Sequence, residues 1–115
     1  MNDRIKDSGK KGTGLLLIMM EVEPEYEEEF NRWYWEEHVP ERMAVPGFIS
    51  ARRYQIVEGS PKYLALYEVE SAEVLQSEAY KTALANATPW TTRMRQHYTF
   101  TRNIYEELLA PTPPA

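Results

Sequence analysis

The hydrophobic pattern begins with an unbroken apolar run at 15–20, inside a segment that covers residues 14–22. A run of this length without polar alternation predicts a β-strand that is buried on both of its faces. From about Pro24 the apolar positions recur at helical spacing, at Tyr26 and Phe30 among others, which predicts an amphipathic helix. The chain therefore starts with a strand followed by a helix.

The predicted helix has a histidine at its far end. Extending the apolar stripe from Tyr34 by four residues reaches His38 on the inward face. Pro40 disfavours helical geometry at the residue before it, so the helix is expected to end at or near His38. The helix dipole would there favour the imidazolium, whereas burial would favour the neutral ring. The sequence leaves the direction of the pKa shift of this histidine open.

The following segments predict a hairpin and further helices. Alternating positions indicate strands at 48–57 and 62–70, and the Gly-Ser-Pro turn between them makes the pair antiparallel. Ser71 is suited to cap a helix that runs to about residue 86. Thr88 followed by Pro89 is suited to open a short helix that ends at about residue 95.

A final strand at 97–105 completes the order βαββαβ, the split βαβ pattern of ferredoxin-like folds. The predicted class is α+β, with a four-stranded antiparallel sheet and both main helices on one face, in a single domain over residues 14–107. The other face keeps apolar positions, and an exposed apolar face usually marks an interface. We therefore expect a homodimer with its sheets face to face and a cavity between each sheet and its helices. The polar segment 1–13 and the Pro-rich segment 108–115 are expected to be disordered tails.

Composition narrows the classes of function. The chain has 115 residues, enough for one domain, and its longest apolar run is too short to cross a bilayer. The absence of Cys excludes disulfides, thiolate nucleophiles and cysteine-ligated metals. A net charge of −5 argues against nucleic acid as the main partner. The charged start is followed by no long apolar segment, so we expect a cytoplasmic protein.

The charges are unevenly distributed. Half of the acidic residues fall between Glu21 and Glu41, where several of them suit the start of the first helix. The stretch from residue 79 to 105 contains no acid, and its cations are Lys81, Arg93, Arg95 and Arg102. Two interpretations of this stretch stay open: a solvated surface, which we favour, and the lining of a site for an anionic small molecule.

Three motifs resemble those of a known superfamily. They are Trp35-Glu-Glu-His38-Val-Pro40, Val45-Pro-Gly47-Phe48 and Arg52-Arg53-Tyr54. In a βαββαβ chain of this size they resemble the dimeric α+β barrel superfamily, and its EthD-like group in particular. The resemblance implies a small, aromatic or polyketide-like ligand in a pocket between the first helix and the sheet. It does not choose among isomerisation, cyclisation, decarboxylation and oxygenation.

Three residues are candidates for catalysis. His38 is a candidate general acid or base, and its alternative role is structural, with the ring bonding a loop carbonyl. Arg53 and Tyr54 are candidates to orient the substrate or to stabilise developing negative charge. Arg52 and Arg53 lie on opposite faces of their strand, so one of them must point to a covered side. Its partner is either Glu68 on the neighbouring strand, which we favour, or a substrate anion.

Further aromatic and polar side chains are candidates for ligand binding. They are Trp35, Tyr67, Trp90, His97 and Thr99. We expect no metal site: Glu37, His38 and Glu41 are close in sequence, but Pro40 is expected to break the helix between them, and a site of two histidines and a carboxylate would need both histidines of the chain to converge. No cofactor is expected either.

The leading hypothesis is a cofactor-independent enzyme that acts on a small aromatic or polyketide-like acid, lactone or ketone, with His38 moving protons. The alternatives are a non-catalytic ligand-binding or accessory protein of a catabolic pathway, and a dimeric assembly factor without a pocket. The enzyme hypothesis requires a cavity of roughly 300 Å³ or more at His38, with at least one further polar group converging on it.

Overall fold

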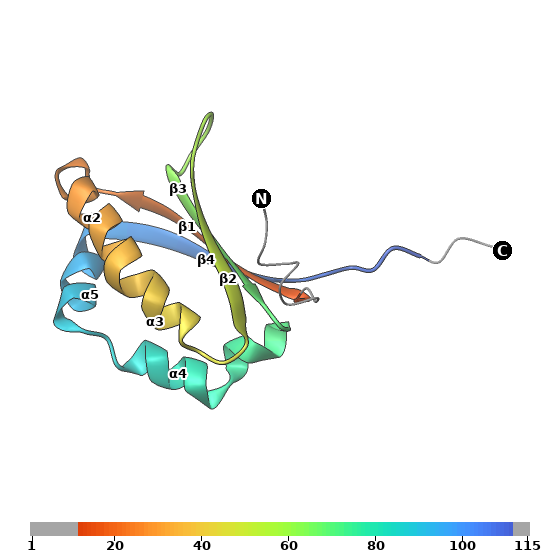
Figure 1. The fold of residues 1–115 in the computed structure, drawn as a ribbon. Helices are drawn as coiled ribbons and strands as arrows, with labels where there is room; N and C mark the ends of the chain where they lie inside the picture. The colour runs from red at the N-terminus through yellow and green to blue at the C-terminus, as the bar shows by residue number, and fades with distance from the viewer. Residues whose placement is uncertain (1–11, 112–115) are drawn as a thin grey trace.

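Four strands form the sheet of the computed structural model, which describes residues 12–111. Their bounds are Gly14–Val22 (β1), Phe48–Gln55 (β2), Tyr63–Val69 (β3) and Tyr98–Glu106 (β4). The spatial order is β2-β3-β1-β4, and each neighbouring pair is antiparallel (Figure 1). This is the ferredoxin-like arrangement, so the predicted α+β fold class is confirmed.

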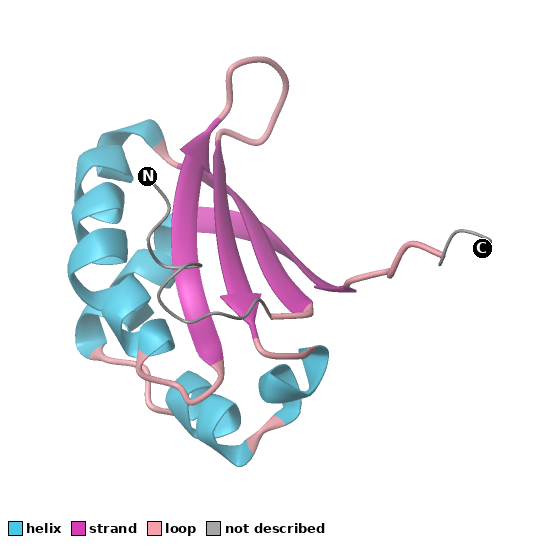
Figure 2. Cartoon of the chain, turned by 45° about the vertical axis from the view of Figure 1, so that its right-hand side comes forward, coloured by secondary structure: helices cyan, strands magenta, loops and turns pink. Residues whose placement is uncertain are grey.

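The central strand β1 uses its two faces differently. Leu16 and Met20 point toward the helices and are each 1% exposed, and Leu16 lies opposite Tyr67 of β3. Leu15 and Leu17 lie on the other face and are only partly buried. The main helices pack on one side of the sheet (Figure 2). Of the two faces of β1 that were predicted to be buried, this chain therefore fully buries only the one toward the helices.

The first helix continues past Pro40. Helical turns run without a break through α2 (Glu27–Trp33), the π-helical turn Tyr34–His38 and α3 (Val39–Met43). The prediction that the helix ends near His38 is therefore wrong. In the π turn the N–H of Val39 donates to the carbonyl of Tyr34, and Pro40 then falls in the first turn of α3, a position that Pro tolerates in helices.

The second helical region is shorter and more broken than predicted. It consists of the 3-10 turn Ala72–Gln76, α4 (Glu78–Ala85), α5 (Pro89–Met94) and the 3-10 turn Arg95–His97. Ser71 makes no capping hydrogen bond, so the predicted cap is wrong; the Ser77 hydroxyl instead accepts from the Tyr80 N–H at 3.1 Å. The predicted cap at Thr88 is confirmed, since its hydroxyl accepts from the Thr91 N–H at 3.1 Å.

One carboxylate joins the first helix to α5. An oxygen of Glu37 accepts hydrogen bonds from the Trp33 indole N–H at 3.1 Å, from the Thr88 hydroxyl at 2.7 Å and from the Thr91 hydroxyl at 3.1 Å. Three donors on one oxygen fix the π turn relative to α5. They thereby also fix the neighbouring residue, His38.

Two residues before β1 bond to the sheet. The Gly12 N–H donates to the Glu68 carboxylate at 2.8 Å, and the Thr13 N–H donates to the Glu70 carbonyl at 3.0 Å. These two residues therefore belong to the folded domain. The rest of the predicted N-terminal tail and residues 112–115 of the predicted C-terminal tail lie outside the described residues. Within the described part of the chain, no helix is long and apolar enough to span a bilayer.

Candidate functional site

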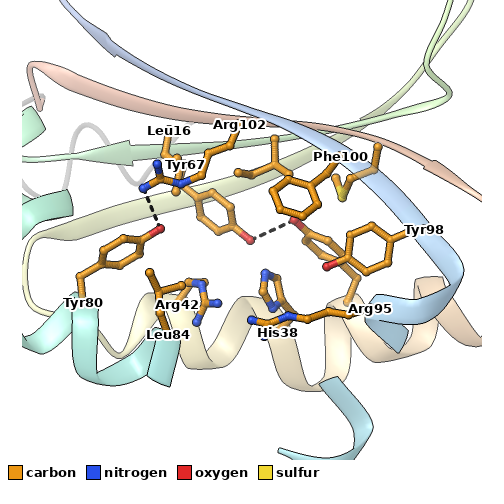
Figure 3. A pocket seen from close by; sticks show the side chains of 13 residues that line it. Leu16, His38, Arg42, Tyr67, Tyr80, Leu84, Arg95, Tyr98, Phe100 and Arg102 are labelled. Carbon is orange, nitrogen blue, oxygen red and sulfur yellow. Dashed lines mark hydrogen bonds between the residues drawn. The ribbon is translucent and has the colours of Figure 1, made fainter. Parts of the chain in front are cut away.

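A cavity of about 360 Å³ lies between the helical layer and the sheet, and His38 forms part of its wall (Figure 3). Its lining is apolar on the sheet side, with Leu16, Ile18, Met20 and Phe100. Four phenols (Tyr34, Tyr67, Tyr80 and Tyr98) and three guanidinium groups (Arg42, Arg95 and Arg102) supply the polar groups. Its size and its converging polar groups meet the geometric requirement of the enzyme hypothesis.

The π turn and ring packing orient His38. Its ring centroid lies 4.7 Å from that of Trp33 and 4.7 Å from that of Tyr34. Its Nδ1 is buried and has no hydrogen-bond partner among the described residues. No loop carbonyl therefore holds this nitrogen, as the structural alternative would require.

The electrostatic surroundings keep the His38 ring neutral. Burial, followed by the positive charges of Arg42, Arg95 and Arg53, lowers the pKa of His38 to about 3. The helix dipole does not oppose this shift at His38, because the helix does not end there. At neutral pH the ring is thus uncharged, and its unprotonated nitrogen can accept a proton.

The guanidinium groups of the cavity come from three separate segments. Arg42 is on α3, one helical turn after His38, and is only 6% exposed. Arg95 follows α5, and Arg102 is on β4. No Asp or Glu is among the residues that line the cavity. The cavity is therefore positively charged and suited to an anionic ligand.

The acid-free stretch divides between the two interpretations that its sequence allowed. Arg95 and Arg102 line the cavity. Lys81 and Arg93 form ion pairs outside it, with Glu78 and Glu29. Two of these four cations thus line the cavity, and the other two lie on the surface in ion pairs.

Two hydrogen bonds connect polar groups of the cavity lining. The Tyr67 hydroxyl donates to that of Tyr34 at 3.4 Å, and the Arg102 guanidinium donates to the Tyr80 hydroxyl at 3.2 Å (Figure 3). Burial raises the pKa of Tyr34 well above its usual value and the pKa of Tyr67 to about 12. Both phenols therefore stay protonated, and because Tyr67 donates to Tyr34, the O–H of Tyr34 is the one that can donate to a ligand oxygen. Tyr67 is the predicted ligand-binding residue that the structure brings together with His38.

Arg53 lies behind the cavity wall. Its guanidinium donates to the Asn31 side-chain oxygen at 2.8 Å and lies 4.4 Å from the ring centroid of Tyr34. The predicted partner, Glu68, is on the opposite face of the sheet, where it accepts from Ser50 at 3.4 Å. The expectation of an Arg–Glu68 pair is therefore wrong for Arg53. A bulge between Phe48 and Ser50 sets which face Arg53 occupies.

The remaining predicted site residues lie outside the cavity. Trp35 and Tyr54 are 51% and 44% exposed, beside Arg53 at an open groove. The Trp90 indole N–H donates to Glu29 at 3.0 Å. The His97 ring stacks on Tyr26 with centroids 3.5 Å apart, and Thr99 is on the sheet face away from the helices. The structure does not gather these five residues around His38.

The described residues contain no group of three or more His, Asp or Glu side chains placed to hold a metal ion. His38 lines the cavity, whereas His97 packs at the surface near Glu23.

Residues 14–108 match the model of the family DUF4286, a domain of unknown function. The chain belongs to the DUF4286 family. No protein of curated function matches it in sequence.

Solved structures share the fold of this DUF4286 chain. An EthD family protein from Bacillus halodurans is 23% identical, with a TM-score of 0.56, over 83% of this chain and 99% of that one. The haem-degrader MhuD from Mycobacterium tuberculosis, solved with two haems in its active site, is 21% identical, with a TM-score of 0.59, over 86% and 99%. SnoaB, a cofactor-independent oxygenase from Streptomyces nogalater, is 16% identical, with a TM-score of 0.58, over 86% and 96%. The resemblance to the dimeric α+β barrel superfamily and to EthD-like proteins is thus confirmed as a likeness of fold, and small-molecule enzymes use this fold.

Arg42 is a cavity residue that was not among the predicted site residues. Its position four residues after His38 is a usable signal, because residues at this spacing share one face of a helix. Ending the helix at His38 removed that signal. Tyr80 and Tyr98 were also missed as cavity residues, and they reach the cavity from segments that are far from His38 in sequence.

Proposed function

We propose that this DUF4286 chain is a cofactor-independent enzyme that moves a proton on an aromatic or polyketide-like acid, lactone or ketone. The observation that supports this most directly is the neutral His38 ring in the wall of an aromatic cavity. A neutral imidazole can accept a proton from an acidic C–H or O–H group of a bound ligand. His38 is therefore the general base of the proposal, and it becomes a general acid only after it has accepted that proton.

The cavity also offers groups that stabilise the product of such a step. When a base takes a proton from the carbon beside a carbonyl, the electron pair moves to the carbonyl oxygen and forms an enolate. Protonated Tyr34, which accepts from Tyr67, and protonated Tyr98 line the cavity and can donate to that oxygen. Return of the proton from His38 to another carbon would complete an isomerisation.

Arg53 acts in this proposal as a positioning residue. It does not line the cavity, but it lies against the outer side of the Tyr34 ring, whose inner side lines the cavity. A cation over an aromatic face holds the ring in place. Arg53 would thereby keep Tyr34 and its partner Tyr67 in position.

The alternative is a binding protein without turnover. With a pKa of about 3 in the cavity without ligand, His38 is a weak base, and a weak base favours this alternative. The two functions differ in one observable: an enzyme exchanges a ligand proton, and a binding protein does not.

We further propose that the functional unit is a homodimer formed through the sheet face away from the helices. That face holds apolar side chains that this chain alone buries only in part: Leu15, Leu17, Met19, Leu64 and Leu66. Contact with the same face of a second copy would remove them from water.

The test uses 2-tetralone, an aromatic ketone with acidic C–H groups, in D2O. Proton NMR measures the loss of its C1 proton signal. We expect wild type to accelerate this exchange above buffer, and His38→Gln to lower the enzymatic rate by about 10²-fold or more. Arg93→Gln, which removes a cation outside the cavity, is the matched control and should keep the wild-type rate.

Equal exchange rates with wild type and His38→Gln would refute the role of His38. Binding of 2-tetralone to wild type, seen as a raised Tm, without faster exchange would favour the binding protein instead.

A further inference from the structure

Arg42 is a buried cation that forms no ion pair among the described residues, although the charge of Glu41 beside it acts on Arg42 and on Arg95. Its side chain lines the cavity, and the residue is 6% exposed. Among residues 12–111 its guanidinium forms no ion pair and no side-chain hydrogen bond. A buried guanidinium is costly unless an anion or several acceptors meet it.

Other arginines of the chain show what a partnered guanidinium looks like here. Arg93 pairs with Glu29, and Arg32 pairs with Glu36. Arg53, which is half-buried, has the Asn31 oxygen and aromatic faces around it. Arg42 differs from all of these, because it faces a cavity of about 360 Å³ that holds no acid.

Arg95 faces the same cavity from the turn after α5, a segment distant from Arg42 in sequence. Figure 3 shows the guanidinium groups of Arg42 and Arg95 close to the His38 ring. Both charges act on that ring electrostatically. Two guanidinium groups near one point form an arrangement that binds a carboxylate or enolate oxygen well.

We propose that Arg42 and Arg95 bind the carboxylate or enolate of a planar aromatic ligand, so that the substrate of this cavity is an aromatic anion. The inference rests on the proposed function in that it concerns the same cavity. The apolar sheet side and the phenols would contact the rings of the ligand, while the two arginines fix its charged end beside His38.

Binding of such an anion would change His38 itself. The charged and titratable groups around it are Arg42 on α3, Arg95 after α5, Arg53 on β2 behind Tyr34, and the phenols of Tyr34, Tyr67 and Tyr98. Glu41 on α3 is the carboxylate that acts on Arg42 and Arg95. The arginines lower the pKa of His38, and an anion on two of them offsets that effect. His38 would become a stronger base when the substrate is bound, although burial, the largest cause of its lowered pKa, would remain.

The first measurement compares two probes that differ in charge alone. They are 2-naphthoate and its neutral analogue 2-naphthamide, with Kd measured by calorimetry on the full chain. We expect wild type to bind naphthoate at least about tenfold more tightly than naphthamide. Equal affinities would refute the inference. This comparison needs no variant, so it does not depend on whether an altered Arg42 folds.

The second measurement assigns the preference to residues. Arg42→Gln and Arg95→Gln should each weaken naphthoate by about tenfold and leave naphthamide unchanged, and Arg42→Lys should restore part of the loss. Arg93→Gln is the matched control on α5 and should bind both probes as wild type does. A naphthoate Kd that neither cavity variant changes would refute the assignment.

The third measurement follows His38 by NMR. Its imidazole titration should move to higher pH when naphthoate is bound and stay in place with naphthamide. An unchanged titration in the naphthoate complex would contradict the coupling.

These outcomes are separable from those of the proposed function. His38→Gln should keep the tight binding of naphthoate even though it loses the exchange of 2-tetralone. Tight naphthoate binding without any proton exchange would keep the anion site and overturn the enzyme. Proton exchange of 2-tetralone without a preference for naphthoate over naphthamide would keep the enzyme and overturn the anion site.

Discussion

The pKa of His38 makes the stability of the fold depend on pH in a defined direction. The folded-state pKa is about 3, below the ordinary value of 6.5, so between these values the unfolded chain binds more protons than the folded one. Stability is therefore fully present above about pH 6.5 and falls as the pH drops toward the folded-state pKa. Lowering the pH from about 7 to about 5 should cost roughly 2 kcal/mol at this residue alone.

Urea unfolding of wild type and His38→Gln at both pH values measures this cost. Glutamine does not titrate, so the variant should lose roughly 2 kcal/mol less free energy of unfolding than wild type over the same interval. His97→Gln removes the other histidine, keeps His38 and should retain the wild-type loss. The same pH dependence in wild type and His38→Gln would refute a His38 that is buried and neutral in the folded protein.

Three further substitutions test other parts of the structure. Glu37→Ala leaves the Thr88 and Thr91 hydroxyls without their acceptor, while the Trp33 indole keeps the Thr91 oxygen. It should lower the free energy of unfolding by about 2 kcal/mol, against less than about 0.5 for the exposed neighbour Glu36→Ala, and similar losses would contradict the network around Glu37. Arg53→Lys loses the planar contact with aromatic rings and should cost about 1 kcal/mol, more than Arg52→Lys on the other face. In sedimentation measurements wild type should be a dimer and Leu17→Glu a monomer, with the same circular dichroism spectrum for both. A variant that remains dimeric would contradict the sheet-face interface.

The sequence by itself determined the order of elements and several local features. The apolar run at 15–20, the helical stripe that reaches His38 and the alternation in the later strands gave the βαββαβ order, which the sheet order confirms. The cap at Thr88 was also readable, because a capping hydroxyl bonds an N–H three residues away. Features of this kind depend on neighbours within one or two helical turns.

Other features depend on segments that are distant in sequence. The cap at Ser77 and the helix that passes Pro40 both differ from the local preference, because tertiary packing and the π turn outweigh a weak local signal. The sequence left open which of Arg52 and Arg53 points to the covered face of the sheet. A bulge after Phe48 decides that it is Arg53.

Only the tertiary structure assembled the cavity charge. Arg42, Arg95 and Arg102 come from α3, the turn after α5 and β4. The acid-free stretch groups Arg95 with Arg102, but nothing in the local sequence places Arg42 beside them. The direction of the His38 pKa shift needed the same information, because burial and the charges of surrounding segments are properties of the folded molecule. Short-range preferences of the chain set its elements, and the long-range packing of those elements set the chemistry of the site.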